Sequence, residues 1–204
     1  MRKMKERVFD YIALDNGTKL SLTKPDTKVM NIENIANALS MQCRFNGQIS
    51  RFYSVAQHCL LVSEIAEKAD SSHAFVGLMH DATEAYIGDL SSPIKQMLPD
   101  YQKLETLIWK KLCQRYELPT QLPKEIHIYD HIALITEASQ LQKGNTWKTW
   151  YPDLEPSDHF IIPLNPPEAA KAFIERFKDL TLPQVEEEVV ELDLSEILED
   201  EYDE

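Results

Sequence analysis

The pattern of hydrophobic and polar positions divides the chain at about residue 31. Residues 8–30 show no helical period and contain Asn16-Gly17, a dipeptide that favours a tight hairpin turn. From residue 31 onward, apolar side chains recur every three or four positions, as they do on the buried face of a helix. The pattern therefore predicts an N-terminal extension of strands or loops over 1–30, followed by a helical body.

The body contains helical segments with recognisable ends. Asn31 and Ser54 precede apolar-periodic runs and suit the N-cap position, while Gly88 and Gly144 follow such runs and suit helix ends. The predicted helices cover about 31–40, 55–69, 72–87, 100–117, 124–143 and 167–180. The predicted loops cover about 43–53, 89–100 and 145–167. We therefore predict an all-α fold, a bundle of six or seven helices with a short N-terminal β-hairpin or loop segment.

Composition narrows the class of protein. There is no run of about 18 consecutive apolar residues, so we expect no membrane span. The first 17 residues are basic without an apolar run behind them, which is typical of neither a secretory signal nor an anchor. Three widely spaced cysteines without a CxxC motif indicate reduced thiols in a cytoplasmic protein. Only five glycines argue against an all-β fold and a Gly-rich phosphate loop.

The charge is concentrated at the C-terminal end. The chain has a net charge of −13, but residues 186–204 contain 11 acidic residues and no Lys or Arg. The remainder is close to neutral, which argues against a nucleic-acid partner. We predict that 183–204 is a solvated acidic tail. The alternative is a helix that docks on a protein partner through Val190, Leu194, Ile197 and Leu198.

Polar side chains occupy core-facing positions on three predicted helices. His58 shares a face with apolar residues on its helix, and His80-Asp81 lies on the next one. Asp130 and Glu137 interrupt the apolar stripe of the helix over 124–143. Each alone could be a hydrogen-bonded core residue, a cap or half of an ion pair. Because burying an isolated carboxylate costs several kcal/mol, their convergence favours a site for one divalent metal ion, Mn, Co, Ni, Fe, Zn or Mg.

The set His58, His80-Asp81 and Asp130 resembles the H…HD…D signature of HD-domain phosphohydrolases, with intervals of 22 and 49 residues. The segments "CRFNGQISRFYSVAQH" and "HDATEAYIGDLSSPIK" are similar to those of the 5′-deoxynucleotidase-like branch of that superfamily. The resemblance covers about residues 30–142 and, more weakly, 160–178. It implies an HD-domain phosphohydrolase over 31–182.

The resemblance also implies roles for individual residues. His58, His80, Asp81 and Asp130 would be the metal ligands, and the metal would acidify a water that attacks the phosphorus. Glu84 would help to activate that water, or would instead orient a ligand imidazole. His127 and His131 flank Asp130 and are expected to be exposed surface residues, with a hydrogen bond to a metal ligand as the alternative for either one.

Four further residues would contact the substrate. Arg44 would bind its phosphate through a bidentate guanidinium, with a surface salt bridge as the alternative. Phe45 stands where the branch commonly has Trp, which leaves any role of the indole N–H in doubt. Asp89 would accept from a sugar hydroxyl or cap a turn, and Lys95 would meet outer phosphates or solvent. Arg51 is a second cationic candidate. Trp147, Trp150 and Tyr151 would line a base pocket or simply pack over the core.

These observations predict a metal-dependent phosphohydrolase for nucleoside 5′-phosphates, with deoxynucleotides as the first expectation. Arg44, Arg51 and Lys95 do not decide between monophosphates and triphosphates. Three alternatives stay open: a catalytically idle nucleotide sensor, an interaction protein that acts through the acidic tail, and an alarmone hydrolase. The base preference, the native metal and the oligomeric state, including a homo-oligomer, are also open.

Overall fold

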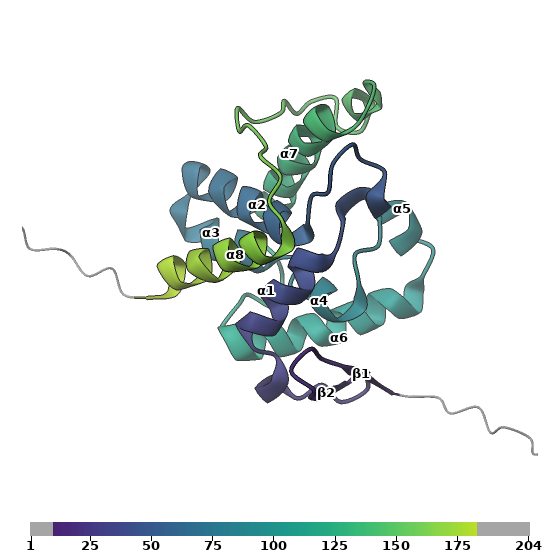
Figure 1. The fold of residues 1–204 in the computed structure, drawn as a ribbon, viewed down its shortest axis with the longest axis vertical. Helices are drawn as coiled ribbons and strands as arrows, with labels where there is room; N and C mark the ends of the chain where they lie inside the picture. Colours follow the sequence, from purple (N-terminus) through teal and green to yellow (C-terminus); the bar gives the residue numbers. More distant parts are fainter. Residues whose placement is uncertain (1–9, 183–204) are drawn as a thin grey trace, which may run out of the picture.

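The computed structural model describes residues 10–182 (Figure 1). At its N-terminal end, strand β1 (Tyr11–Ala13) pairs antiparallel with β2 (Lys19–Ser21). The turn between them includes Gly17, whose φ of 78° lies in the left-handed region that favours glycine. The predicted hairpin is therefore confirmed, and it contributes the fully buried Leu20 to the core.

The rest of the described chain is mostly helical, which confirms the coarse prediction of an all-α body. The α-helices are α1 (Ile32–Met41), α2 (Val55–Ala69), α3 (Ala74–Met79), α4 (Glu84–Ile87), α5 (Ser92–Lys95), α6 (Pro99–Tyr116), α7 (Lys124–Leu141) and α8 (Pro166–Thr181). Short 3-10 helices are η1 (Thr27–Val29), η2 (Arg44–Gly47), η3 (Ser71–His73) and η4 (Thr146–Thr149). Asn31 and Ser54 cap α1 and α2 as predicted, each by accepting a hydrogen bond from a backbone N–H three residues later.

The prediction of one continuous helix over about 72–87 is wrong. The chain forms η3 and α3, turns at residues 80–83, and resumes as α4. The ring of His80 contacts the carbonyl oxygen of Gly77 through Nδ1 at 2.8 Å. This bond takes an acceptor that a continuing helix would give to the N–H of residue 81. The three predicted loops also contain short helices, η2 in 43–53, α5 in 89–100 and η4 in 145–167.

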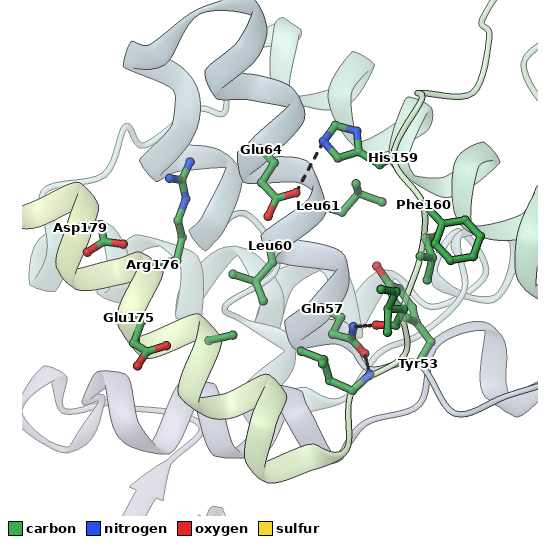
Figure 2. A pocket seen from close by; sticks show the side chains of 14 residues that line it. Tyr53, Gln57, Leu60, Leu61, Glu64, His159, Phe160, Glu175, Arg176 and Asp179 are labelled. Atoms are coloured by element: carbon green, nitrogen blue, oxygen red, sulfur yellow. Dashed lines mark hydrogen bonds and ion pairs between the residues drawn. The ribbon is translucent and has the colours of Figure 1, made fainter.

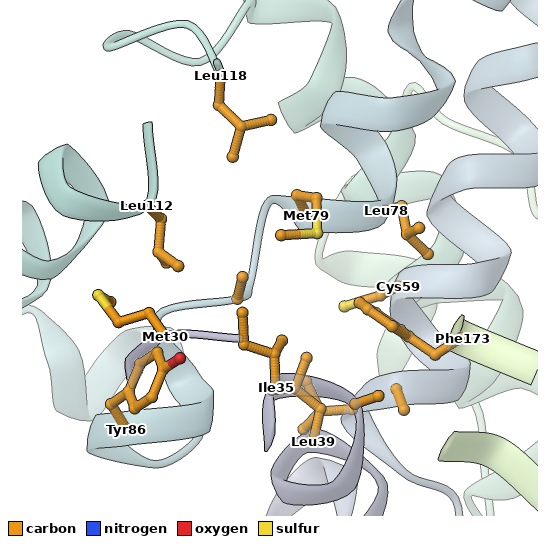
Figure 3. Packing of buried hydrophobic residues seen from close by; sticks show 14 of the residues in the cluster. Met30, Ile35, Leu39, Cys59, Leu78, Met79, Tyr86, Leu112, Leu118 and Phe173 are labelled. Carbon is orange, nitrogen blue, oxygen red and sulfur yellow. The ribbon is translucent and has the colours of Figure 1, made fainter. Parts of the chain in front are cut away.

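The helices surround one main apolar core. Helix α2 packs against α3, α7 and α8, and α1 packs against α4 and α8. Figure 3 shows side chains of this core that come from distant segments, including Leu39, Cys59, Met79 and Phe173. Helices α2 and α3 approach closely at Gly77, where an added Cβ would lie 3.2 Å from the carbonyl oxygen of Val62. This packing fixes the position of the turn that follows α3.

Three further sequence predictions concern membrane spans, the cysteines and the acidic tail. Over the described residues, no helix combines the length and apolar character needed to cross a bilayer. Cys43, Cys59 and Cys113 are free thiols, of which Cys59 and Cys113 are buried and Cys43 is half-buried. The acidic tail over 183–204, with its amphipathic positions, lies outside the described residues.

Candidate metal centre

The four predicted metal ligands converge from three parts of the fold. His58 lies on α2, His80 and Asp81 lie in the turn after α3, and Asp130 lies on α7. The Nε2 atom of His58 is 3.1 Å from Oδ1 of Asp130 and 3.5 Å from Oδ2 of Asp81. The Nε2 atom of His80 is 3.2 Å from Oδ2 of Asp81 and 4.0 Å from Oδ1 of Asp130. The structure thus brings together residues that are up to 72 positions apart in the chain.

Hydrogen bonds on the far side of each imidazole determine which nitrogen faces the cluster. The Nδ1 atom of His58 lies 2.7 Å from Oε1 of Glu137, and that of His80 lies 2.8 Å from the carbonyl oxygen of Gly77. An ionised carboxylate and a carbonyl can only accept, so both Nδ1 atoms donate. In neutral rings the Nε2 lone pairs therefore point into the cluster. Both Nε2 atoms are buried and have no hydrogen-bond partner.

This arrangement fits a divalent cation. Ligand atoms about 2.1 Å from one ion, at angles between octahedral and tetrahedral, lie roughly 3.0–3.4 Å from each other. The nearest nitrogen–oxygen distances, 3.1, 3.2 and 3.5 Å, are close to that range. Although Asp130 lies 3.1 Å from His58, it does not satisfy the Nε2 atom as a hydrogen-bond partner. The donor set of two nitrogens and two carboxylates could hold Mn, Co, Ni, Fe, Zn or Mg.

The charges in the cluster stabilise one another. Burial and the nearby Arg44 lower the pKa of His58, but the carboxylates of Glu137 and Asp130 outweigh them and raise it to about 10. Burial raises the pKa of Asp130, yet contact with His58 and His80 brings it down to about 2. The pKa of Asp81 is lowered for the same reason, chiefly by His80. Without a cation, the positive charge of protonated His58 offsets the negative charge of the carboxylates. A cation bound at Nε2 of His58 would have to displace this proton.

A thiol also approaches the cluster. The Sγ atom of Cys59 forms a close group with ligand atoms of His80 and Asp81. Burial raises the pKa of Cys59 well above its usual value, so this thiol stays protonated, whereas metal ligation requires a thiolate. The second group of close ligand atoms, His58, His80 and Asp130, contains no sulfur and has two of the buried, unpartnered nitrogens. We therefore regard Cys59 as a core residue beside the site.

Glu84 lies at the start of α4 and is 3% exposed. Its Oε2 atom has no hydrogen-bond partner, and its Oε1 atom lies 3.7 Å from Nζ of Lys95. Burial, followed by the carboxylates of Asp81 and Asp89, raises the pKa of Glu84 well above its usual value. A carboxyl group whose pKa is raised by burial and by neighbouring carboxylates is more basic than a free one, which suits an acid–base catalyst.

The side chain of Arg44 is only 11% exposed and contacts carboxylates of the site, so the alternative of a surface salt bridge is wrong. Its Nε and Nη2 atoms donate to Oε2 of Glu137 at 3.4 and 3.3 Å, and its Nη1 atom lies 3.8 Å from Asp89. The ring of Phe45 lies 5.5 Å from the guanidinium carbon. Phe45 and Asn46 have φ values of 56° and 50°, a left-handed conformation that costs energy for residues other than glycine.

Lys95 also has anionic neighbours. Its Nζ atom lies 2.7 Å from Oε1 of Glu105 on α6, in addition to the contact with Glu84. The lysine is half-buried, so the alternative of a solvent-exposed Lys95 is wrong. Because Arg44 and Lys95 already face carboxylates, the cationic groups of the site are compensated before any anion binds.

No sequence pattern pointed to Gln42, which connects two predicted site residues. Its Nε2 atom donates to the carbonyl oxygen of Glu84 at 2.9 Å, and its Oε1 atom accepts from the N–H of Asp89 at 2.8 Å. The partners are backbone atoms more than 40 residues away, so no side-chain pattern could reveal them. The sequence placed Glu137 as a carboxylate in an apolar stripe, but it did not predict the contacts of Glu137 with His58 and Arg44.

The other aromatic and basic candidates lie at the edge of the site or away from it. Tyr151 stacks on His131, with the ring centroids 3.8 Å apart, and His131 follows Asp130 in the chain. His127 and Arg51 are exposed, and Trp150 is 39% exposed. Among Trp147, Trp150 and Tyr151, the residues considered for a base pocket, Tyr151 stacks on the neighbour of Asp130 in the chain.

A cavity of about 400 Å³ lies elsewhere, between α2, α8 and the segment 159–164 (Figure 2). Its walls include Gln57, Leu60, Leu61 and Glu64, which share one face of α2. His58 is turned roughly 100° away from Gln57, as successive residues on an α-helix are. None of the four metal-ligand candidates lines this cavity, so its size does not bear on the cluster.

No family model matches the chain. Over 174 residues, it is 40% identical to the uncharacterized protein YfdR of Escherichia coli, an alignment that covers 84% of this chain and 96% of YfdR. Over 137 residues, it is 32% identical to the uncharacterized protein RCAP_rcc00048 of Rhodobacter capsulatus, covering 62% of this chain and 70% of that protein. Neither name states an activity. The identity to YfdR over nearly its whole length shows that this chain belongs to the YfdR family.

Proposed function

We propose that this protein is a metal-dependent phosphohydrolase of the HD-domain superfamily that acts on nucleoside 5′-phosphates, with deoxynucleotides as the expected substrates. One observation carries the proposal. The buried Nε2 atoms of His58 and His80 have no partner and face the carboxylates of Asp81 and Asp130. Buried polar atoms are nearly always satisfied, so two such atoms beside two carboxylates favour a cation.

His58, His80, Asp81 and Asp130 would hold the cation. A divalent cation held there would lower the pKa of a water molecule and neutralise negative charge on the phosphate. The raised pKa of Glu84 suits a residue that takes a proton from the attacking water. Glu84 follows His80 by four residues, but a turn separates α3 from α4, so the two residues do not lie on one continuous helix.

Arg44 would bind the substrate phosphate. The side chain of Arg44 is 11% exposed, and its guanidinium contacts Glu137, which also contacts His58. Asp89, held by Gln42, would accept a hydrogen bond from the sugar, and the ring of Phe45 would support the guanidinium. Lys95 would contact a phosphate only by exchanging a contact with Glu84 or Glu105.

The test is the release of phosphate, pyrophosphate or triphosphate from a panel of nucleotides. The panel pairs deoxyribonucleotides with ribonucleotides, 5′-phosphates with 3′-phosphates, and monophosphates with triphosphates. Each is incubated with Mn²⁺, Co²⁺, Ni²⁺ or Mg²⁺. We expect metal-dependent release from 5′-deoxynucleotides that is abolished in Asp130→Asn. The matched control is Asp158→Asn, a carboxylate whose side chain is 81% exposed.

Two outcomes would contradict the proposal. Release that persists after complete removal of metal would exclude the metal centre as the catalytic site. Nucleotide binding to metal-loaded protein without any turnover would favour the catalytically idle sensor instead.

A further inference from the structure

Glu137 contacts both a metal-ligand candidate and the arginine proposed to bind phosphate. Its side chain is fully buried on α7. The Oε1 atom accepts from Nδ1 of His58 at 2.7 Å, while the Oε2 atom accepts from Nη2 and Nε of Arg44 at 3.3 and 3.4 Å. Among the described residues, it is the carboxylate whose two oxygens divide between these two groups.

Glu137 is placed to support the site from behind rather than to bind the cation. It follows Asp130 by seven residues on one helix, so the two side chains share a face but lie about 10 Å apart along the axis. The imidazole of His58 spans this gap. Its Nε2 atom lies 3.1 Å from Asp130, and its Nδ1 atom lies 2.7 Å from Glu137.

We propose that Glu137 is a positioning residue that holds His58 in the tautomer needed for metal binding and fixes Arg44 beside it, so that one carboxylate joins cation binding to phosphate capture. The inference rests on the proposed metal centre. The contact with Glu137 requires a hydrogen on Nδ1 and leaves Nε2 of the neutral ring as the metal-binding atom. The negative charge behind the ring also makes Nε2 more basic, which strengthens its bond to a cation.

The contact with Arg44 follows from the same burial. A carboxylate with no exposed surface is costly unless cationic or donating partners satisfy both oxygens. His58 satisfies one oxygen of Glu137 and Arg44 the other. Removing the carboxylate would therefore release Arg44 toward Asp89, its other anionic neighbour, 3.8 Å away.

The principal test is metal affinity in Glu137→Gln, measured by titrating metal-free protein with Co²⁺ and following heat and visible absorption. We expect the Kd for Co²⁺ to rise about 10- to 100-fold, as is typical when the partner of a ligand imidazole is removed. Glu137→Asp keeps the charge but draws it back by one methylene, and should lie between the wild type and Glu137→Gln. Glu175→Gln is the matched control, because its side chain is 59% exposed and its ion-pair partner is Lys171 on the same helix.

A second measurement addresses Arg44. Inorganic phosphate is titrated into each protein at saturating Co²⁺, so that metal occupancy is equal. We expect weaker phosphate binding in Glu137→Gln than in the control, because Arg44 has lost the carboxylate that fixes it. Far-UV circular dichroism and Tm establish that each variant is folded.

If Glu137→Gln fails to fold, nitrogen NMR of wild-type histidines decides the matter. We expect the hydrogen of neutral His58 on Nδ1, with the signal assigned by comparison with His58→Gln. A neutral His58 ring that carries its single hydrogen on Nε2, or Co²⁺ affinity in a folded Glu137→Gln equal to that of the wild type, would overturn the inference and leave the proposed function standing. Wild-type protein that binds none of the four metals would overturn both. Because neither readout uses a nucleotide, a wrong substrate class would not affect them.

Discussion

The side-chain oxygen of Gln42 accepts a hydrogen bond of 2.8 Å from the backbone N–H of Asp89. The same amide donates to the carbonyl oxygen of Glu84, so Gln42 joins the first residue of α4 to a residue just beyond its C-terminal end. Gln42 follows α1 directly, and its backbone N–H is bonded to Leu39 of that helix. The positions of Glu84 and Asp89 thus depend on a residue that touches neither carboxylate.

We expect Gln42→Ala to lower kcat/KM while leaving the affinity for metal unchanged. The substitution removes the acceptor of the Asp89 N–H and the donor to the Glu84 carbonyl oxygen. The side chain of Gln42 makes no hydrogen bond to any of the four metal-ligand candidates. An unsatisfied backbone group costs about 1–3 kcal/mol, which should also lower Tm. Exposed Gln114→Ala is the control, and equal kinetics in both variants would contradict a role for Gln42.

Glu84→Gln should reduce turnover by about 10²-fold or more, the usual contribution of a general base. The amide has the shape of the carboxyl group but cannot take a proton from water. Metal content, measured on the same samples, should stay at the wild-type level. Loss of metal would assign Glu84 to the coordination of the cation, and wild-type turnover would remove it from the mechanism.

Sequence periodicity predicted the parts of the fold that local interactions determine. Asn31 and Ser54 cap α1 and α2 because their hydrogen bonds stay within the first helical turn. The helix over 72–87 was predicted as continuous because the side chains of 80–83 are compatible with a helix. The contact between His80 and Gly77 that accompanies the break depends on ring orientation, which periodicity does not encode.

The candidate site shows the same division. Asp130 and Glu137 could be found in the sequence because carboxylates are rare on a face that is otherwise apolar. The sequence could not show that Asp130 lies beside Nε2 of His58 whereas Glu137 contacts Nδ1, because this depends on how the ring is oriented in the folded protein. The partners of Lys95 and Gln42 come from other elements of the fold, so no regular spacing in the sequence could predict them.

Removal of metal should lower Tm. The cation would join α2, α7 and the turn after α3, and it binds the folded state alone. At a free concentration 100 times Kd it would add about 2.7 kcal/mol, which corresponds to a Tm change of roughly 5–10 °C for a chain of this size. Differential scanning calorimetry with and without a chelator measures the change. Asp130→Asn, treated in the same way, should show little response.

The metal-free protein should lose stability as pH rises from about 6.5 to about 10. The pKa of His58 is raised from 6.5 to about 10, so the folded state holds a proton in this window that the unfolded state releases. The stabilisation is complete below pH 6.5 and disappears as pH passes the folded-state pKa. Urea unfolding from pH 6 to 10 measures this, and His58→Gln should show a weaker dependence over the same window.

Metal binding should have the opposite pH dependence. A cation at Nε2 of His58 must displace the proton, so affinity should increase with pH until His58 is neutral in the free protein. Titrations at pH 7.5 in buffers with different ionisation enthalpies should give different apparent heats, from which the number of released protons follows. Binding heats that do not depend on the buffer would contradict displacement of a proton.

Arg44→Lys should lower kcat/KM clearly even though the positive charge is retained. The guanidinium of Arg44 uses Nε and Nη2 on Glu137 and directs Nη1 toward Asp89, an arrangement that needs a planar group with several donors. A lysine ammonium is a compact charge and cannot keep both contacts while offering paired donors to a phosphate. The effect should appear mainly as weaker binding of phosphate at saturating metal, because Arg44 does not belong to the ligand set.

Arg51→Lys is the matched control, since Arg51 is exposed seven residues further along the chain. If the two variants have equal kinetics and Arg44→Lys lowers only Tm, then Arg44 is a buried structural ion pair of Glu137, and the phosphate must be bound by other groups.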